Sequence, residues 1–119
     1  MAISGPSLSV HVKITVDPSD IDAFLKALQP TYDAVIAEPL NTFFEVYQDA
    51  RTPGIFKLVE NWDASVEYMR TVQEKKEYYK AYFETTRPMY KKPLELEIYT
   101  RMPGNKWVSV KKDAYPGRE

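Results

Sequence analysis

The chain has 119 residues, of which 44% are hydrophobic and 28% charged, as in one soluble globular domain without a membrane-spanning segment. Its formal net charge of −1 provides no basic surface for nucleic acid or for an anionic membrane. It has no cysteine, which excludes disulfides, thiolate catalysis and cysteine-ligated metals, so we expect a cytoplasmic protein without nucleic-acid or membrane partners.

The N-terminal third predicts a strand followed by a helix. Residues 8–16, LSVHVKITV, alternate apolar and polar side chains, which is typical of a strand with one apolar face. Asp17 has the side chain of an N-cap residue, and Pro18 suits the first position of a helix. Pro30 should kink or break this helix because it lacks an amide hydrogen, and residues 32–37 should continue it. The expected buried stripe of the helix is Ile21, Phe24, Leu25 and Leu28.

The middle of the chain predicts a β-hairpin and a second helical region. Residues 41–49 and 55–62 have strand patterns, and the intervening ARTPG is a turn sequence. Asp63 should cap a helix that places Val66, Met69 and Val72 on its buried side. Helical character resumes through KKEYYKAYFETTR and should end before Pro88.

The remaining elements complete a ferredoxin-like pattern. Residues 94–101 predict a fourth strand, and KWVSVKK, residues 106–112, a short fifth one. The order strand, helix, strand, strand, helix, strand predicts an α+β fold of βαββαβ type, with helices on one face of an antiparallel sheet. We expect a single domain over residues 1–119, with a core at about 8–101 and a C-terminal extension at 102–119.

The uncovered face of this sheet predicts a homodimer. It carries charged side chains, but Phe43 and Val59 make it only half polar. Such a face meets either water or a second copy of the chain. Trp107 in the extra strand favours the second copy, because a small domain has no evident place to bury that ring. The chain's one histidine, His11, falls on this face, which favours an interface role over catalysis.

One strand combines a carboxylate with an apolar face. Phe56, Leu58, Glu60 and Trp62 point to the same side, because side chains alternate along a strand. A carboxylate among apolar neighbours is expensive to ionise, so the pKa of Glu60 should rise towards neutrality. That would suit a general acid or base acting on a phenol or an activated C–H bond. The alternative is a structural Glu60, held by a buried ion pair with Arg70 or by a hydrogen bond to a tyrosine.

The block AEPLNTFFEVYQDARTPGIFKLVENW, residues 37–62, resembles the centre of antibiotic biosynthesis monooxygenase domains, members of the dimeric α+β barrel superfamily. The resemblance covers roughly residues 8–100, with Leu40 where a glycine is usual. It implies a cavity between sheet and helices, with Glu60 directed inward. Leu58 stands where the anthrone-type oxygenases of the family place an enolate-binding asparagine. Residues 65–76 lack the histidine of the haem-degrading members, which argues against haem degradation.

The resemblance implies a cofactor-independent monooxygenase that acts on an aromatic or polyketide-like small molecule in secondary metabolism or aromatic catabolism. Glu60 and Trp62 are the expected catalytic residues, as base and cavity wall, with a tyrosine hydroxyl as oxyanion partner. An isomerase or cyclase of the same fold stays open, as does a dimeric ligand-binding or stress protein without turnover. We expect no metal and no cofactor. The side chains expected to bind substrate are Leu58, Phe44, Tyr68, Tyr79, Tyr82 and Phe83.

Overall fold

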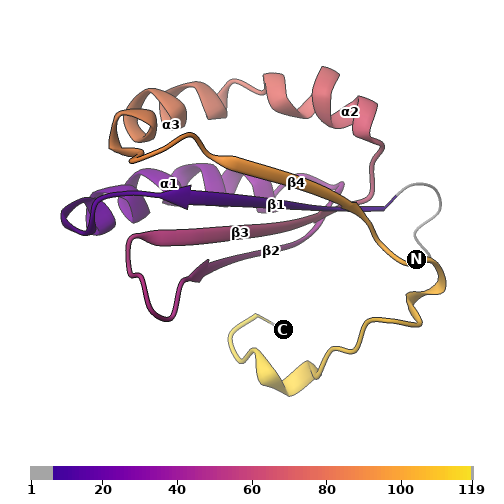
Figure 1. Ribbon diagram of the computed structural model, residues 1–119. Coiled ribbons are helices and arrows are strands. Elements are labelled where there is room, and N and C mark those ends of the chain that lie inside the picture. Colours follow the sequence, from indigo (N-terminus) through magenta and orange to yellow (C-terminus); the bar gives the residue numbers. More distant parts are fainter. Residues whose placement is uncertain (1–6, 119) are drawn as a thin grey trace.

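The computed structural model describes residues 7–118 and contains one four-stranded antiparallel sheet in the order β2–β3–β1–β4. All three α-helices lie on the same side of the sheet (Figure 1). This arrangement confirms the predicted ferredoxin-like fold. The elements are β1 (Leu8–Thr15), α1 (Ile21–Ile36), β2 (Asn41–Gln48), β3 (Ile55–Trp62), α2 (Val66–Thr71), α3 (Tyr78–Thr86) and β4 (Glu95–Thr100).

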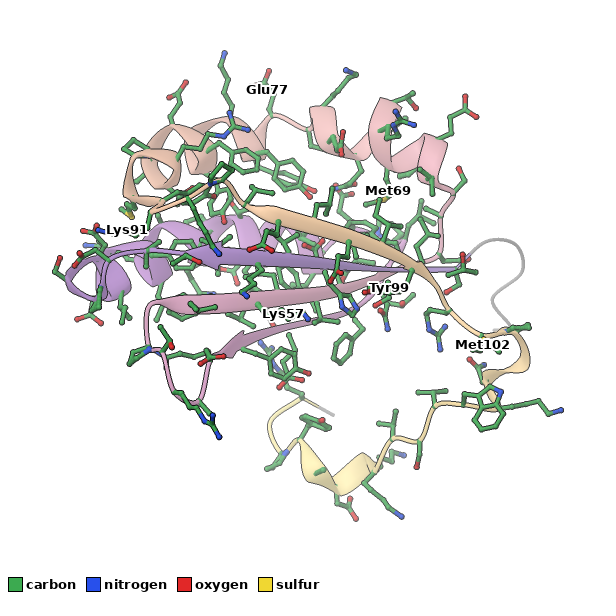
Figure 2. All side chains as sticks on the ribbon, viewed as in Figure 1. Lys57, Met69, Glu77, Lys91, Tyr99 and Met102 are labelled. Atoms are coloured by element: carbon green, nitrogen blue, oxygen red, sulfur yellow. The ribbon has the colours of Figure 1, made fainter. Side chains whose placement is uncertain are left out.

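The register of the strands fixes which side chains face the helices. Glu60 of β3 lies between Val10 of β1 and Phe44 of β2, so these three side chains share the inner face. Lys57 and Tyr99 lie on the opposite face, away from the helices, whereas Met69 of α2 lies on the helical side (Figure 2). The sheet therefore has one covered face and one open face.

The core between sheet and helices forms two adjoining clusters. One joins Phe24 and Leu28 of α1 to buried side chains of β1 and β3. The other surrounds Trp62, which is fully buried, and includes Val35 of α1 and Met69 of α2. Burying such side chains contributes about 1.5–3 kcal/mol each, which holds all three helices against one face.

Helix α1 continues through Pro30 to Ile36 without a break, which agrees with the expected continuation of the helix after the proline. Phe24 and Leu28 before the proline, and Thr31 and Val35 after it, all face the core. Packing on both sides of the residue therefore offsets the backbone hydrogen bond that proline cannot make. The predicted place of Leu25 in the buried stripe was wrong, because 39% of its surface is exposed. Asp17 does act as a cap: its carboxylate accepts from the Ser19 amide at 2.9 Å and begins a short 3₁₀ turn, Pro18–Asp20.

The second helical region is interrupted. Ser65, not Asp63, caps α2 by accepting from the Tyr68 amide at 3.1 Å. Val66 and Val72 are exposed rather than buried, because α2 is short and only Met69 faces the core. A 3₁₀ turn, Gln73–Lys75, follows, and the extended backbone of Lys76 separates it from α3. This interruption directs Gln73 inward.

The expected fifth strand is absent. Residues 101–118 form an irregular segment with two 3₁₀ turns, Pro103–Asn105 and Lys112–Ala114, which runs below the open face of the sheet (Figure 1). Gly104 and Asn105 both have positive φ, which turns the backbone out of the extended conformation that a strand requires. Trp107 is 80% exposed. No helix in the described part of the chain is long and apolar enough to cross a membrane.

Candidate active site

A cavity of about 450 Å³ lies between the inner face of the sheet and the helices. Most of its wall is apolar and comes from β1, β3, β4 and α1. Its volume falls within the range of small-molecule sites, which are largely apolar with a few polar groups that orient the ligand. Its main polar groups are Thr31, Glu60, Gln73 and Tyr79, with Glu74 and Arg87 also on the wall.

Glu60 lines this cavity from β3, and its one hydrogen bond within the described part of the chain is from Trp62, whose Nε1 donates to Oε1 at 3.0 Å. Within residues 7–118 no cationic side chain forms an ion pair with it; Arg70 is exposed on α2. Burial raises the pKa of Glu60 to about 7, and the Trp62 hydrogen bond opposes that rise only in part. The carboxyl group can therefore exchange a proton near neutral pH.

Two tyrosine hydroxyls share the environment of Glu60. Tyr79 and Tyr82 of α3 both line the cavity. Burial raises the pKa of Tyr79 well above its usual value, and the charge of Glu60 adds to the effect. Burial also raises the pKa of Tyr82, with smaller contributions from Tyr90 and from Glu60. Both hydroxyls therefore keep their protons and can act as hydrogen-bond donors to a ligand.

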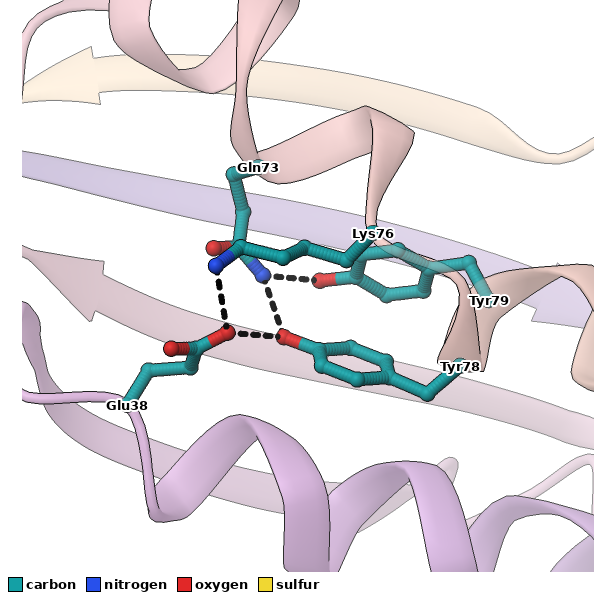
Figure 3. A network of polar contacts seen from close by, with 5 residues as sticks. All are labelled: Glu38, Gln73, Lys76, Tyr78 and Tyr79. Atoms are coloured by element: carbon teal, nitrogen blue, oxygen red, sulfur yellow. Dashed lines mark hydrogen bonds and ion pairs between the residues drawn. The ribbon is translucent and has the colours of Figure 1, made fainter.

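The Tyr79 hydroxyl belongs to a polar network that also includes Glu38, Gln73, Lys76 and Tyr78 (Figure 3). The Gln73 side-chain nitrogen donates to the hydroxyls of Tyr78, at 2.6 Å, and of Tyr79, at 2.9 Å. The Tyr78 hydroxyl donates to Glu38 at 2.7 Å, and Lys76 lies 3.4 Å from the same carboxylate oxygen. Burial raises the pKa of Tyr78 to about 12, with the hydrogen bond to Glu38 as the next cause. The network thus runs from the cavity to the partly exposed pair of Glu38 and Lys76.

The structure brings most of the predicted site residues together. Trp62 lies outside the lining and reaches the site through its hydrogen bond to Glu60. Tyr68 also lies outside the lining and packs against the core cluster around Trp62. Gln73 was missed because it is polar and belongs to a charged stretch; its spacing of four residues from Met69 was the available signal. The predicted residues on the cavity wall are Glu60, Leu58, Phe44, Tyr79, Tyr82 and Phe83.

His11 lies on the open face, away from the cavity. Its Nε2 is 2.9 Å from the Ser9 hydroxyl, and its ring centroid is 4.9 Å from that of Tyr99. In the described part of the chain, no group of three or more histidine, aspartate or glutamate side chains is placed to bind a metal ion. The ionisable and hydroxyl groups on the cavity wall are the carboxyl groups of Glu60 and Glu74, the guanidinium of Arg87 and the hydroxyls of Thr31, Tyr79 and Tyr82.

Comparison with known proteins agrees with this geometry. The family model described as antibiotic biosynthesis monooxygenase matches residues 7–85. A protein of Pestalotiopsis microspora, provisionally named a monooxygenase, is 55% identical over 114 residues, which cover 96% of this chain and 95% of the relative. Among solved structures, a protein of Nitrosomonas europaea provisionally assigned as an antibiotic biosynthesis monooxygenase has a TM-score of 0.75 at 21% identity, covering 87% of this chain and 98% of that one.

A second solved structure, from Caulobacter crescentus CB15 and with the same provisional assignment, has a TM-score of 0.73 at 18% identity. It covers 82% of this chain and 91% of its own. At these identities the two solved structures show the shared fold, while the family model and the Pestalotiopsis relative show the membership. This chain belongs to the antibiotic biosynthesis monooxygenase family.

Proposed function

We propose that this protein is a cofactor-independent monooxygenase that oxidises a flat phenolic or polyketide-like molecule, in secondary metabolism or aromatic catabolism. The observation that carries the proposal is the environment of Glu60. Its carboxyl group opens into a mostly apolar cavity of about 450 Å³ and has no cationic partner among the described residues. A group held there only for stability would be paired or replaced, because an unpaired buried carboxylate is costly.

The chemistry would begin with proton transfer. Glu60 removes a proton from an activated CH₂ group, and the electron pair moves onto the conjugated oxygen as an enolate or phenolate. This electron-rich carbon reduces O₂, forms a C–O bond and gives a hydroperoxide. Loss of water leaves a carbonyl: one oxygen atom stays on carbon, and the other departs as water with both hydrogens of the CH₂ group. The substrate itself supplies the electrons.

The hydroxyl groups on α3 would stabilise the anionic oxygen. Leu58 lines the cavity but cannot donate a hydrogen bond. Tyr79 and Tyr82 line the same cavity and retain their protons, so they can take that role. A hydrogen bond to developing charge in a water-poor site is worth about 10²–10³ in rate. The apolar wall would also keep water from the carbanion.

Oxygen consumption tests the proposal. Purified protein would be given anthrone, a tricyclic ketone with an activated methylene, in an oxygen electrode while quinone is followed by absorbance. We expect equimolar O₂ uptake and quinone formation above the rate of autoxidation, and about a 10²–10⁴-fold lower rate in Glu60→Gln. Proton exchange at the methylene without O₂ uptake would support the isomerase or cyclase reading instead. If neither reaction depends on Glu60, the proposal is wrong.

The open sheet face supports a homodimer as the working form. Phe43, Tyr47 and Tyr99 are 37%, 43% and 48% exposed on that face. The segment with Trp107 and Val110, 80% and 72% exposed, runs beyond the same face (Figure 1). A second copy would cover both, as expected of apolar surface in a small oligomer. Native mass spectrometry of freshly purified protein tests this, since a monomer at micromolar concentration would contradict it.

A further inference from the structure

Gln73 is almost completely buried, with 1% of its surface exposed, and it lies on the cavity wall. It belongs to the short 3₁₀ turn Gln73–Lys75 that follows α2, while its two hydroxyl partners open α3 (Figure 3). The amide therefore joins the end of one helical segment to the start of the next. It also lies between the cavity and the ion pair of Glu38 and Lys76.

Counting protons shows how the Gln73 amide must be turned. The Tyr78 hydroxyl has a single proton, and it donates that proton to the carboxylate of Glu38 at 2.7 Å. Its oxygen can therefore only accept in the 2.6 Å contact with Gln73. The atom of Gln73 that faces Tyr78 must then be the NH₂ group, whose second hydrogen is donated to Tyr79 at 2.9 Å.

This arrangement decides what Tyr79 can offer a ligand. Its oxygen accepts from Gln73, so its own proton is directed elsewhere. Among the described residues, the one acceptor that affects the pKa of Tyr79 as a hydrogen-bond partner is the neutral Tyr78 oxygen. An anionic ligand oxygen is a stronger acceptor than a neutral hydroxyl, because charge-assisted hydrogen bonds are about twice as strong. An anionic ligand oxygen in the cavity would therefore accept the Tyr79 proton in place of the Tyr78 oxygen.

The other end of the Gln73 amide carries an energetic cost. The carbonyl oxygen of Gln73 is buried and has no hydrogen-bond partner among residues 7–118. Leaving such an acceptor unpaired is unfavourable, and native proteins keep few such groups. The carbonyl oxygen of Gln73 thus stays unpaired while both N–H groups of its amide donate to tyrosine hydroxyls.

We propose that Gln73 is a positioning residue: by occupying the acceptor side of the Tyr79 hydroxyl, it directs that proton into the cavity, where it binds a phenolate or enolate oxygen of the ligand. The inference rests on the proposed function. It names Tyr79 as the hydrogen-bond donor to the anionic oxygen, because this chain has Leu58 where the anthrone-type oxygenases have an asparagine. It makes an aromatic ligand with an ionisable hydroxyl the best fit to this wall.

A chromogenic phenol tests the inference directly. 4-Nitrophenol turns yellow on ionisation, so absorbance at neutral pH reports what fraction of the bound probe carries the negative charge. Wild type, Tyr79→Phe, Gln73→Met and the double variant would be titrated with it. We expect each single variant to bind about 10-fold more weakly and to hold less of the probe as phenolate. The double variant should match Tyr79→Phe, because Gln73 acts through that hydroxyl.

Two further variants keep the test decisive. Gln48→Met makes the same chemical change at an exposed site, where the amide donates to the Pro53 carbonyl at 2.8 Å, and should leave probe binding unchanged. If Gln73→Met does not melt cooperatively, Gln73→Leu replaces it, with the same loss expected because an aliphatic side chain cannot donate to Tyr79.

The possible results separate the two proposals. Additive losses in the double variant, or wild-type ionisation of the probe in Gln73→Met, would overturn the positioning role and leave the proposed function standing. Failure of the wild type to bind the phenol at all would overturn both.

Discussion

Replacing Glu60 by glutamine should make the protein more stable while it abolishes the proposed base. Glutamine has nearly the same shape and keeps an oxygen that can accept from Trp62 Nε1, now 3.0 Å from the carboxylate. The change therefore removes the charge with little change in packing. It isolates the cost of holding an ionised carboxylate on the cavity wall.

The size and the pH dependence follow from the pKa. Folding raises the pKa of Glu60 from 4.5 to about 7, so the folded state prefers the neutral acid. Below pH 4.5 the group is neutral in folded and unfolded chains, and it imposes no ionisation cost. Between pH 4.5 and 7 the unfolded chain loses its proton first, so wild-type stability falls as pH rises, and then levels off. A difference of about 2.5 pKa units corresponds to about 3 kcal/mol.

Urea denaturation at pH 4.5 and at pH 8, at one fixed protein concentration, measures this effect. We expect Glu60→Gln to exceed wild type by about 3 kcal/mol more at pH 8 than at pH 4.5. Glu84→Gln, at an exposed position on α3, is the matched control and should change stability by less than about 0.5 kcal/mol. Equal stability differences for Glu60→Gln at both pH values would refute the account of an unpaired carboxyl group.

Three other changes test separate parts of the structure. Trp62→Phe removes the hydrogen bond that opposes the rise in the pKa of Glu60, so the midpoint of the pH–rate profile should move to higher pH; an unchanged midpoint would contradict that role. Pro30→Ala should stabilise the protein by about 1–3 kcal/mol in urea denaturation, since it restores an amide hydrogen inside α1; a lower stability would show that the proline is needed there. Gly54→Ala should destabilise by at least about 2 kcal/mol in the same measurement, because the new Cβ would collide with the Val16 carbonyl oxygen; near wild-type stability would contradict that steric argument.

The strands could be predicted from local pattern, because alternation alone decides which strand face is apolar. The bounds of β3, Ile55–Trp62, agree with the prediction, and so does the inward direction of Glu60. The same pattern could not show what surrounds that carboxylate. The choice between a cavity and an ion pair with Arg70 depends on how α2 ends, which is a matter of tertiary packing.

Where local rules and packing disagreed, packing decided the outcome. The helix rule for Pro30 describes an isolated helix, whereas α1 is held on both sides of the proline by core contacts. Residues 106–112, by contrast, have a strand pattern but do not form a strand. They have alternating apolar side chains but no neighbouring strand to pair with after the turn at Gly104 and Asn105, so they stay irregular.

Two energetically unfavourable groups of this domain lie on the wall of the same cavity. A chain of this size has a total stability of about 5–15 kcal/mol, so a buried carboxyl group without a cationic partner and an amide carbonyl without a hydrogen-bond partner are large local costs. Glu60 and Gln73 carry these costs on the wall of the same cavity, where Gln73 donates to the Tyr79 hydroxyl and the charge of Glu60 contributes to raising the pKa of Tyr79. A cavity kept only by imperfect packing would be lined more favourably by apolar side chains throughout. We therefore propose that Glu60 and Gln73 are kept on this wall because they act on a ligand, Glu60 directly and Gln73 through the Tyr79 hydroxyl.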